Sequence, residues 1–311
     1  MVQMGAKEPL SHFRLCRAMA FVRFKPLVPL VSSALMLLNG CTTQVLLHPD
    51  TARKAAARRP VVPGSYGDHP EFITVTNPNG CRLTGWGFFS PTNRGIILVG
   101  DGNATGIAQT YEYNRYLMNQ GFNVLVLSYQ GFDANDGGAD IKSLYGDVEA
   151  FYSFSRQRFP GLPIALMAES ISTAPFFCAA SHHPEVAALI FEAMVDPKSA
   201  MFAKLNDWWL FYPFYPLTIG AVCLISAGVP GNLNVEKALR NPSDVPALFI
   251  HHPKDKITPY RIARRIFNGY HGPKQWITLE KRHSWERHMT ASYDVEVKEE
   301  VVRFLKRNLV Q

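Results

Sequence analysis

The sequence has few charged residues, few cysteines and no internal repeat. Charged side chains make up 18% of the 311 residues and hydrophobic ones 47%, which excludes a disordered chain and allows one large globular domain or two small ones. The five cysteines lack metal-ligand spacing, so we expect no metal site. The spacing indicates no disulfide pairing either, and we expect Cys178 and Cys223 to be buried thiols.

A strong positive charge outside the N-terminus is also lacking. The formal net charge is +7. Residues 1–40 carry five basic side chains against one acidic side chain, Glu8, so the remainder has a net charge of only +3. This balance gives weak grounds for nucleic-acid binding, and we expect none.

The N-terminus is typical of an export signal. Arg23 and Lys25 precede the apolar run PLVPLVSSALMLL, which is short for a membrane span. The stretch LNGC, residues 38–41, resembles the lipobox of bacterial lipoproteins, and this resemblance implies cleavage before Cys41 and lipid attachment to its thiol. We therefore expect a signal peptide over 1–40, a lipid-anchored tether over 41–70 and an exported domain held at the bacterial cell envelope. An uncleaved signal anchor is the alternative.

From residue 71 onward, strand patterns alternate with helix patterns. An Asn-Gly pair at 79–80 separates two strand-like runs and predicts a hairpin. Further strands are expected where apolar runs are bounded by turn residues, over 95–100, 122–129, 163–168, 186–194, 247–252 and 275–280. The alternation predicts an α/β domain over 71–311, with a mostly parallel central sheet, helices on both faces and an antiparallel start.

Residues 197–243 interrupt this alternation. They separate two strands by more than a normal connection. A transmembrane segment fits the length, but Pro213 and Pro216 interrupt its start. We therefore expect a helical cap insertion over about 197–243, with core or pocket-lining aromatic residues at Trp208, Trp209, Phe211, Tyr212, Phe214 and Tyr215.

The stretch Ala-Glu-Ser-Ile-Ser, residues 168–172, resembles the sequence pattern G-x-S-x-G of a nucleophile elbow, with small residues in place of both glycines. Ser170 follows a buried strand and opens a helix, which is the context that an elbow requires. The helix N-terminus offers unpaired N–H groups near the hydroxyl. Ser170 is therefore the candidate nucleophile, and a helix-capping serine is the alternative.

A candidate acid and a candidate base follow Ser170 in the chain. Asp255 and His283 each lie just after a predicted strand. The order Ser, Asp, His, with acid and base in loops after strands, resembles the α/β-hydrolase superfamily. The resemblance covers about residues 71–311 and implies a catalytic triad of these three residues. Asp196 is the alternative acid, with helix capping favoured for it, and His288 is the alternative base.

Two loops extend the resemblance and also depart from it. LVGDGNATG is similar to the strand and His-Gly-Asn turn of the superfamily, with Asp101 in place of histidine. That likeness implies an oxyanion hole made by the backbone N–H groups of Asn103 and Ile171. LSYQGFDANDGG is similar to a further family loop, with Gln130 in place of arginine.

Together these residues predict a serine hydrolase that cleaves an ester-type acyl bond, as a carboxylesterase, lipase or thioesterase does, through an acyl-enzyme. Its substrate would be a small-molecule or lipid ester, and no metal or organic cofactor is expected. The altered elbow, Asp101 and Gln130 motivate an alternative, a catalytically weak or inactive lipoprotein of the same fold that acts as a binding or scaffold module.

Overall fold

The computed structural model describes residues 42–58, 69–103, 105–205, 215–241, 243–255, 257–280 and 295–310. They fall in one unit of the chain, Leu38–Gln311. The predicted signal peptide, residues 1–40, and the predicted lipid attachment site, Cys41, lie outside the described residues.

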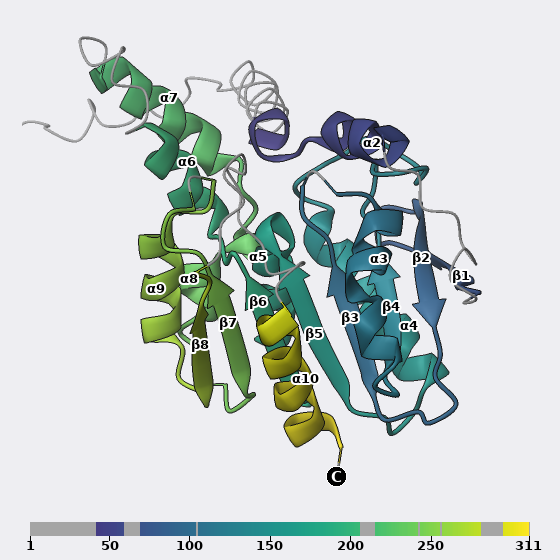
Figure 1. Ribbon diagram of the computed structural model, residues 1–311. Coiled ribbons are helices and arrows are strands. Elements are labelled where there is room, and N and C mark those ends of the chain that lie inside the picture. Colours follow the sequence, from purple (N-terminus) through teal and green to yellow (C-terminus); the bar gives the residue numbers. More distant parts are fainter. Residues whose placement is uncertain are drawn as a thin grey trace, which may run out of the picture. The chain divides into compact units, whose positions relative to one another are not determined.

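The described residues contain one eight-stranded sheet with the order β1-β2-β4-β3-β5-β6-β7-β8 (Figure 1). Its central strands are the continuous apolar runs that the sequence predicts, and four of the five are buried at every position. They are β3 (Ile96–Gly100), β4 (Asn123–Leu127), β5 (Ile164–Glu169), β6 (Ala188–Glu192) and β7 (Ala247–His251). β8 (Lys274–Thr278) is the half-exposed edge strand. Apolar residues on both faces need cover from both sides, which helices supply.

The sheet begins antiparallel and continues parallel. β1 (Glu71–Thr76) pairs with β2 (Arg82–Phe88) as a hairpin, and β2 is also antiparallel to β4. The turn closes through a hydrogen bond from Gly80 N to Asn77 O of 2.9 Å, and Gly80 has a φ of 80° that suits glycine. All remaining pairs are parallel. The predicted hairpin and the mainly parallel sheet are confirmed.

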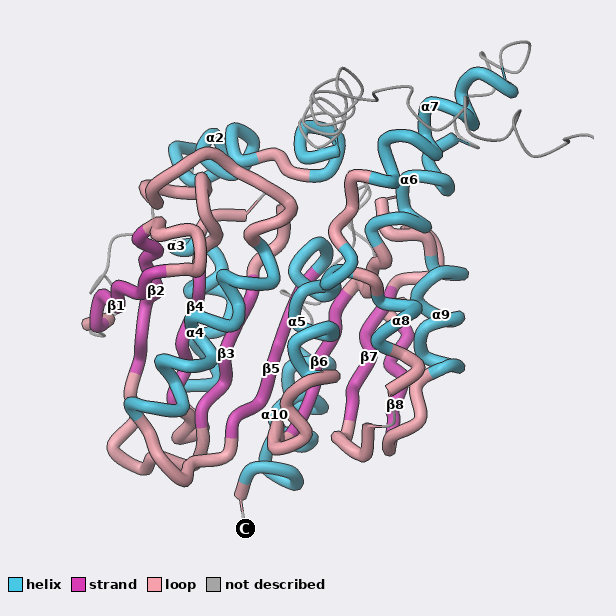
Figure 2. Tube along the Cα trace, turned by 180° about the vertical axis from the view of Figure 1, so that it is seen from behind, coloured by secondary structure: helices cyan, strands magenta, loops and turns pink. Residues whose placement is uncertain are grey.

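Helices cover both faces of the sheet. On one face lie α3 (Ile107–Met118) and α10 (Val295–Leu309), which share a core cluster with Ile97 and Val99 of β3. On the other lie α4 (Leu144–Arg158), α5 (Thr173–Ala180), α8 (Val235–Ala238) and α9 (Tyr260–Gly269), in a cluster with Ile96 and Leu98. Figure 1 shows α3 and α10 in front of the sheet, and Figure 2 shows it from behind. Alternate residues of one strand thus serve two cores.

The described parts of the insertion are helical. They comprise α6 (Pro197–Leu205), α7 (Tyr215–Ala227), the short 3₁₀ helix η3 (Gly231–Leu233) and α8. Of the aromatic residues expected here, only Tyr215 is described, at the start of α7. Leu224 is 58% exposed and Phe202 39% exposed, so this region presents apolar side chains to solvent. Among the described helices, none has the length and apolar character needed to cross a membrane.

Residues 42–58 differ from the expected tether. Residues 42–48 pack against the domain and are called the strap below, and α2 (Pro49–Arg58) follows them. Thr42 is fully buried, and Leu46 and Leu47 are 7% and 3% exposed within the same core cluster as α4 and α5. The tether over 41–70 stays a prediction, but its residues 42–48 lie packed against the domain and not in a free linker. Two adjacent leucines gain free energy by burial, roughly 1.5–3 kcal/mol each, and this favours packing over a solvated linker.

Candidate active site

Ser170 begins the turn that joins β5 to α5. It is the first residue of the 3₁₀ helix η1 (Ser170–Ser172), and α5 follows without a break. Its φ of 54° lies in the left-handed region, which a non-glycine residue seldom adopts unless its surroundings hold it there. Thr173 supplies such a hold, since its hydroxyl donates to Ser170 O at 2.6 Å and accepts from Val195 N at 3.0 Å. The strand, turn and helix expected around Ser170 are present.

The elbow has Ala168 and Ser172 where the motif has glycines, and the neighbouring strand β3 provides the space for them. Gly100 of β3 pairs with Ala168 of β5. A Cβ atom on Gly100 would lie 2.7 Å from Phe176 Cζ and 3.0 Å from Ser172 Cβ, both closer than atoms in proteins normally approach. Ser172 also donates a hydrogen bond to the backbone oxygen of Asp101, the next residue after Gly100. A glycine on β3 therefore gives space that the elbow itself does not provide.

A pocket of about 350 Å³ opens at Ser170. The loop after β3 contributes Gly102 and Asn103, the elbow contributes Ser170 and Ile171, and the loop after β7 contributes Ile257 and Thr258. These loops meet because β3, β5 and β7 run parallel and their carboxyl ends share one edge of the sheet. The volume lies at the lower end of the range for small-molecule sites, about 300–1,000 Å³.

Asp255 holds the loop that reaches this pocket from β7. Its Oδ1 atom accepts hydrogen bonds from Ile257 N at 2.7 Å and Thr258 N at 2.8 Å. The residue is 7% exposed. Asp255 thus fixes the two residues that line the pocket, and it lies in the loop after β7 as the sequence predicts.

The predicted base cannot be placed beside these groups. His283 and the alternative base, His288, both lie outside the described residues. Two further histidines at the end of β7, His251 and His252, are buried, with 1% and 3% of their surface exposed. His251 Nε2 lies 2.8 Å from Thr258 O, and Nδ1 of His252 accepts from Lys254 N at 3.0 Å. Both imidazoles therefore take part in the structure of the acid loop.

The alternative acid, Asp196, has a capping role. Its Oδ2 atom accepts from Ser199 N at 2.9 Å and from the Ser199 hydroxyl at 2.6 Å. Pro197 follows as the first residue of α6, a position that proline favours. These contacts are those of an N-cap, which is the role that the sequence favoured for Asp196.

Asn103 has a role that the sequence did not indicate. Its side-chain Oδ1 accepts from His48 N at 2.8 Å, and its Nδ2 donates to Leu46 O at 2.5 Å. The side chain therefore bridges two backbone groups of the strap. No sequence motif points to this contact, since 55 and 57 residues separate the bonded partners.

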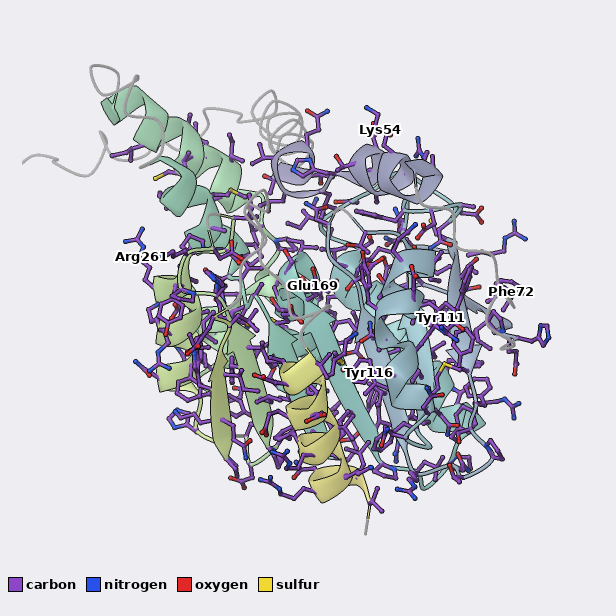
Figure 3. The ribbon with its side chains drawn as sticks, viewed as in Figure 1. Lys54, Phe72, Tyr111, Tyr116, Glu169 and Arg261 are labelled. Atoms are coloured by element: carbon purple, nitrogen blue, oxygen red, sulfur yellow. The ribbon has the colours of Figure 1, made fainter. Side chains whose placement is uncertain are left out.

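Asp101, which stands where the superfamily has histidine, is a buried acid beside other acids. Burial raises the pKa of Asp101 well above its usual range, and the charges of Asp133 and Glu169 raise it further. Glu169 is the last residue of β5, at the same edge of the sheet (Figure 3). The raised pKa favours the neutral form of Asp101, which limits the negative charge near the pocket.

Gln130, which stands where the superfamily has arginine, supports the loops behind the site. Its side-chain oxygen accepts from Asn77 Nδ2 and Asn79 Nδ2, both at 3.0 Å, and its nitrogen donates to Gly138 O at 2.9 Å. Its backbone N donates to Asp147 Oδ2 at 2.9 Å. This departure from the family pattern therefore has a structural role.

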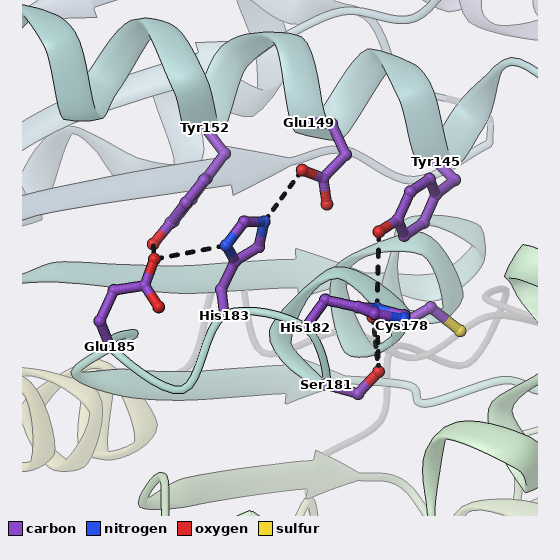
Figure 4. Close-up of polar contacts among 8 residues, drawn as sticks. All are labelled: Tyr145, Glu149, Tyr152, Cys178, Ser181, His182, His183 and Glu185. Carbon is purple, nitrogen blue, oxygen red and sulfur yellow. Dashed lines mark hydrogen bonds and ion pairs between the residues drawn. The ribbon is translucent and has the colours of Figure 1, made fainter. Parts of the chain in front are cut away.

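A second cluster combines hydroxyl, imidazole and carboxylate groups between α4 and the end of α5 (Figure 4). His183 Nε2 lies 2.9 Å from Glu149 Oε2, and its Nδ1 lies 3.3 Å from Glu185 Oε1. Ser181 Oγ lies 3.3 Å from Nδ1 of the neighbouring His182. The hydrogen bond with Glu149 is the largest of the effects that raise the pKa of His183. We call these five residues the histidine cluster.

The described cysteines form no disulfide and include no metal ligand set. Cys178 is buried, as expected, and burial raises the pKa of its thiol to about 12. Cys223 was expected to be buried but is exposed on α7, because that apolar helix lies partly open to solvent. Among the described residues, no three His, Cys, Asp or Glu side chains gather as a metal site would require.

No known family profile matches the chain, but curated proteins resemble it at low identity. It is 23% identical over 226 residues to the uncharacterized protein YfhR of Escherichia coli, covering 69% of this chain and 74% of that protein. It is 24% identical over 272 residues to the uncharacterized protein Rv2307c of Mycobacterium tuberculosis, covering 85% and 87%. Human alpha/beta hydrolase domain-containing protein 17B is 22% identical over 194 residues, covering 61% and 60%.

Solved structures resemble the fold over most of the chain. An esterase from Pyrococcus furiosus superposes with a TM-score of 0.61 at 15% identity, covering 80% of this chain and 97% of that one. The α/β hydrolase GrgF of a Penicillium species gives 0.59 at 16% identity, covering 77% and 99%. A Butyrivibrio proteoclasticus protein with ferulic acid bound gives 0.59 at 15% identity, covering 76% and 99%. With the strand order of the sheet, these likenesses show that the chain has the α/β-hydrolase fold.

Proposed function

We propose that the protein is a serine hydrolase that cleaves an ester-type acyl bond at Ser170. One observation carries the proposal. Ser170 has left-handed backbone at a strand-to-helix turn and lines a pocket of about 350 Å³ together with the loop that Asp255 holds. A buried, conformationally restrained serine at such a pocket fits a nucleophile better than a helix cap.

In the proposed reaction, the Ser170 hydroxyl attacks the acyl carbonyl while His283 removes its proton and Asp255 orients the imidazole. The backbone N–H groups of Asn103 and Ile171 stabilise the oxyanion. The carbon–oxygen bond to the leaving alcohol then breaks, the alcohol takes the proton from His283, and Ser170 is left acylated. Water, deprotonated by His283, releases the acid and restores Ser170.

The substrate class follows from the pocket and from the relatives. Its walls include the apolar side chains of Ile171, Val195 and Ile257, so an uncharged ester with an apolar acyl or alcohol group fits best. Structural neighbours include an esterase, which supports ester cleavage as the reaction.

We also propose that the domain is held at the membrane of the bacterial cell envelope by a lipid on Cys41. Thr42, the next residue, is fully buried and donates to Ile225 O of α7 at 2.5 Å. The domain therefore begins directly after the proposed attachment point. Leu224 on α7 is 58% exposed, and an apolar side chain there suits a position near lipid. Loss of fatty-acid labelling in Cys41→Ser would support this location, and retained labelling would contradict it.

A binding or scaffold role on the same fold is the second candidate. Glu169, an acidic side chain that lines the pocket, favours this role because negative charge at the pocket opposes an oxyanion. The two candidates differ in whether Ser170 turns over an ester.

The test is ester hydrolysis by the full chain and by two serine variants. With p-nitrophenyl esters, Ser170→Ala should lower kcat by about 10⁴-fold or more. Ser181→Ala removes the serine hydroxyl beside His182 in the histidine cluster, and it should leave kcat within about twofold because that cluster has no role in the proposed reaction. Wild-type turnover that Ser170→Ala leaves unchanged would contradict the proposal, and a wild type that turns over no ester would favour the binding role.

A further inference from the structure

The strap, residues 42–48, forms part of the wall of the candidate active-site pocket. Val45, Leu46 and His48 line it together with Ser170 and Asn103. Val45 remains 38% exposed, although it is a large apolar side chain. Its exposure at the pocket is what a contact with an apolar ligand group would require.

The strap is fixed at both ends, which a flexible leader would not be. At its start, the Thr42 hydroxyl donates to Ile225 O of α7 at 2.5 Å. A few residues later, Leu46 and Leu47 are buried in the main core cluster. At its end, Asn103 bonds to the backbone of Leu46 and His48. These contacts tie the strap to the insertion, the core and the loop after β3.

The bridge from Asn103 links the strap to the proposed oxyanion hole. Its side chain makes two hydrogen bonds to the strap, while the proposed function assigns its backbone N–H to the oxyanion. Because one residue carries both groups, a shift of the strap would move the N–H. A displacement near 1 Å at a catalytic group can cost on the order of 10²-fold in rate.

We propose that the strap determines the substrate specificity of this site: Val45 and Leu46 form the wall against which the apolar chain of the ester lies, and the Asn103 side chain keeps that wall and the oxyanion loop in register. The inference rests on the proposed function for its substrate class. It assigns to residues just after Cys41 a part in substrate recognition that neither the superfamily likeness nor the triad prediction contains.

The first test changes the size of the wall. The full chain is assayed with p-nitrophenyl esters from acetate to decanoate. Val45→Trp should lower kcat/KM for octanoate and decanoate by about tenfold or more and leave acetate within about twofold, because only the longer chains reach the wall. Gln44→Trp is the matched control, since Gln44 is an exposed neighbour that does not line the pocket. A uniform loss over all chain lengths in Val45→Trp, or an equal shift in Gln44→Trp, would overturn the inference.

The second test concerns the Asn103 bridge. Asn103→Ala removes both side-chain bonds but keeps the backbone N–H, so kcat should fall by about tenfold to a hundredfold. Asn103→Gln keeps an amide that can accept from His48 N and donate to Leu46 O without added charge, and it should recover part of that loss. Thermal unfolding of both variants is measured alongside. Equal kcat in both variants, with a loss that follows the unfolding temperature alone, would show a merely structural role.

A binding assay separates failure of this inference from failure of the proposed function. Methyl ketones from butan-2-one to decan-2-one carry the carbonyl of an ester without a leaving group, and their binding to Ser170→Ala is followed by NMR titration. Adding Val45→Trp should raise the Kd for decan-2-one by about tenfold and leave the Kd for butan-2-one unchanged. If no ester is hydrolysed but this shift occurs, the function fails and the strap inference stands. If esters are hydrolysed and neither profile shifts, the inference fails alone.

Discussion

The pocket at Ser170 and the histidine cluster contain the same kinds of residue but differ in the backbone conformation of their serines. The cluster offers a serine, two imidazoles and two carboxylates, with His183 paired to carboxylates on both sides. Ser170 has left-handed backbone and is buried, whereas Ser181 has helical backbone, and each of the two serines lines a pocket of about 350 Å³. The comparison teaches that residue types and pocket size alone do not single out a nucleophile, and that the restrained backbone of Ser170 is what favours it in the proposed function.

After the change of Ser170 itself, the largest expected effect comes from the acid loop. Asp255→Asn keeps an oxygen that can accept from Ile257 N and Thr258 N, so the loop should persist while the charge proposed to orient His283 is lost. We expect kcat for ester hydrolysis to fall by about 10³- to 10⁴-fold.

Asp196→Asn is the matched control for that change. An asparagine still caps α6 by accepting from Ser199 N, and kcat should stay within about threefold. A fall in kcat as large as that of Asp255→Asn would make Asp196 the acid and remove the reason to place the triad at Asp255.

An intermediate effect is expected where β3 makes room for the elbow. Gly100→Ala forces a Cβ against Phe176 and Ser172, and overpacking of this kind lowers the free energy of unfolding by about 1–3 kcal/mol. Since Ser172 is two residues from Ser170, kcat should fall as well. Urea denaturation and ester turnover measure the two effects.

Gly138→Ala is the control for a glycine in open space, because a Cβ there would meet nothing within 4 Å. It should change the free energy of unfolding by less than about 0.5 kcal/mol. If Gly100→Ala lowers the free energy of unfolding no more than Gly138→Ala does, Gly100 is not what allows this elbow to form without its own glycines.

The smallest effect is expected in the histidine cluster. Glu149 raises the pKa of His183 in the folded protein, so the charged imidazole stabilises the fold. That contribution is complete below the unfolded pKa, about 6.5, and is lost as pH rises through the higher folded value. His183→Gln should therefore lower the free energy of unfolding at pH 5.5, by less than about 1 kcal/mol for a partly exposed pair, and change it little at pH 9.

His183→Gln should leave the rate of ester turnover unchanged, whereas changes at the Ser170 pocket should lower it. Glu149→Gln removes the largest cause of the raised pKa and should flatten the same pH dependence. A difference in stability that grows with pH, or a loss of turnover, would contradict this assignment of the cluster.

The sequence predicted most of the sheet and the setting of Ser170, because strands buried on both faces must be apolar throughout. β3 and β7 are such runs, and the turn after β5 follows from the apolar stretch that ends at Ser170. The hairpin was predictable for another reason, since Asn79 and Gly80 encode a local turn.

The rest depended on contacts between residues far apart in the chain. Gly100 lies on β3 but provides the space that Ser172, after β5, needs. The hydrogen bond from Thr42 to Ile225 joins residues that are 183 positions apart. The strap has no periodic pattern, so its composition suggested a linker. Cys223 was expected to be buried because free cysteines usually are, but its exposure on α7 depends on whether that helix is covered, which the sequence does not indicate.

The central claim is that Ser170 is the nucleophile, and active-site labelling tests it most directly. The full chain is treated with a fluorophosphonate, which phosphonylates activated serines, and the modified residue is mapped by mass spectrometry. The account predicts one adduct, on Ser170, that Asp255→Asn suppresses and Ser181→Ala does not. An adduct on Ser181 or another serine, or no adduct in a protein that hydrolyses esters, would contradict it.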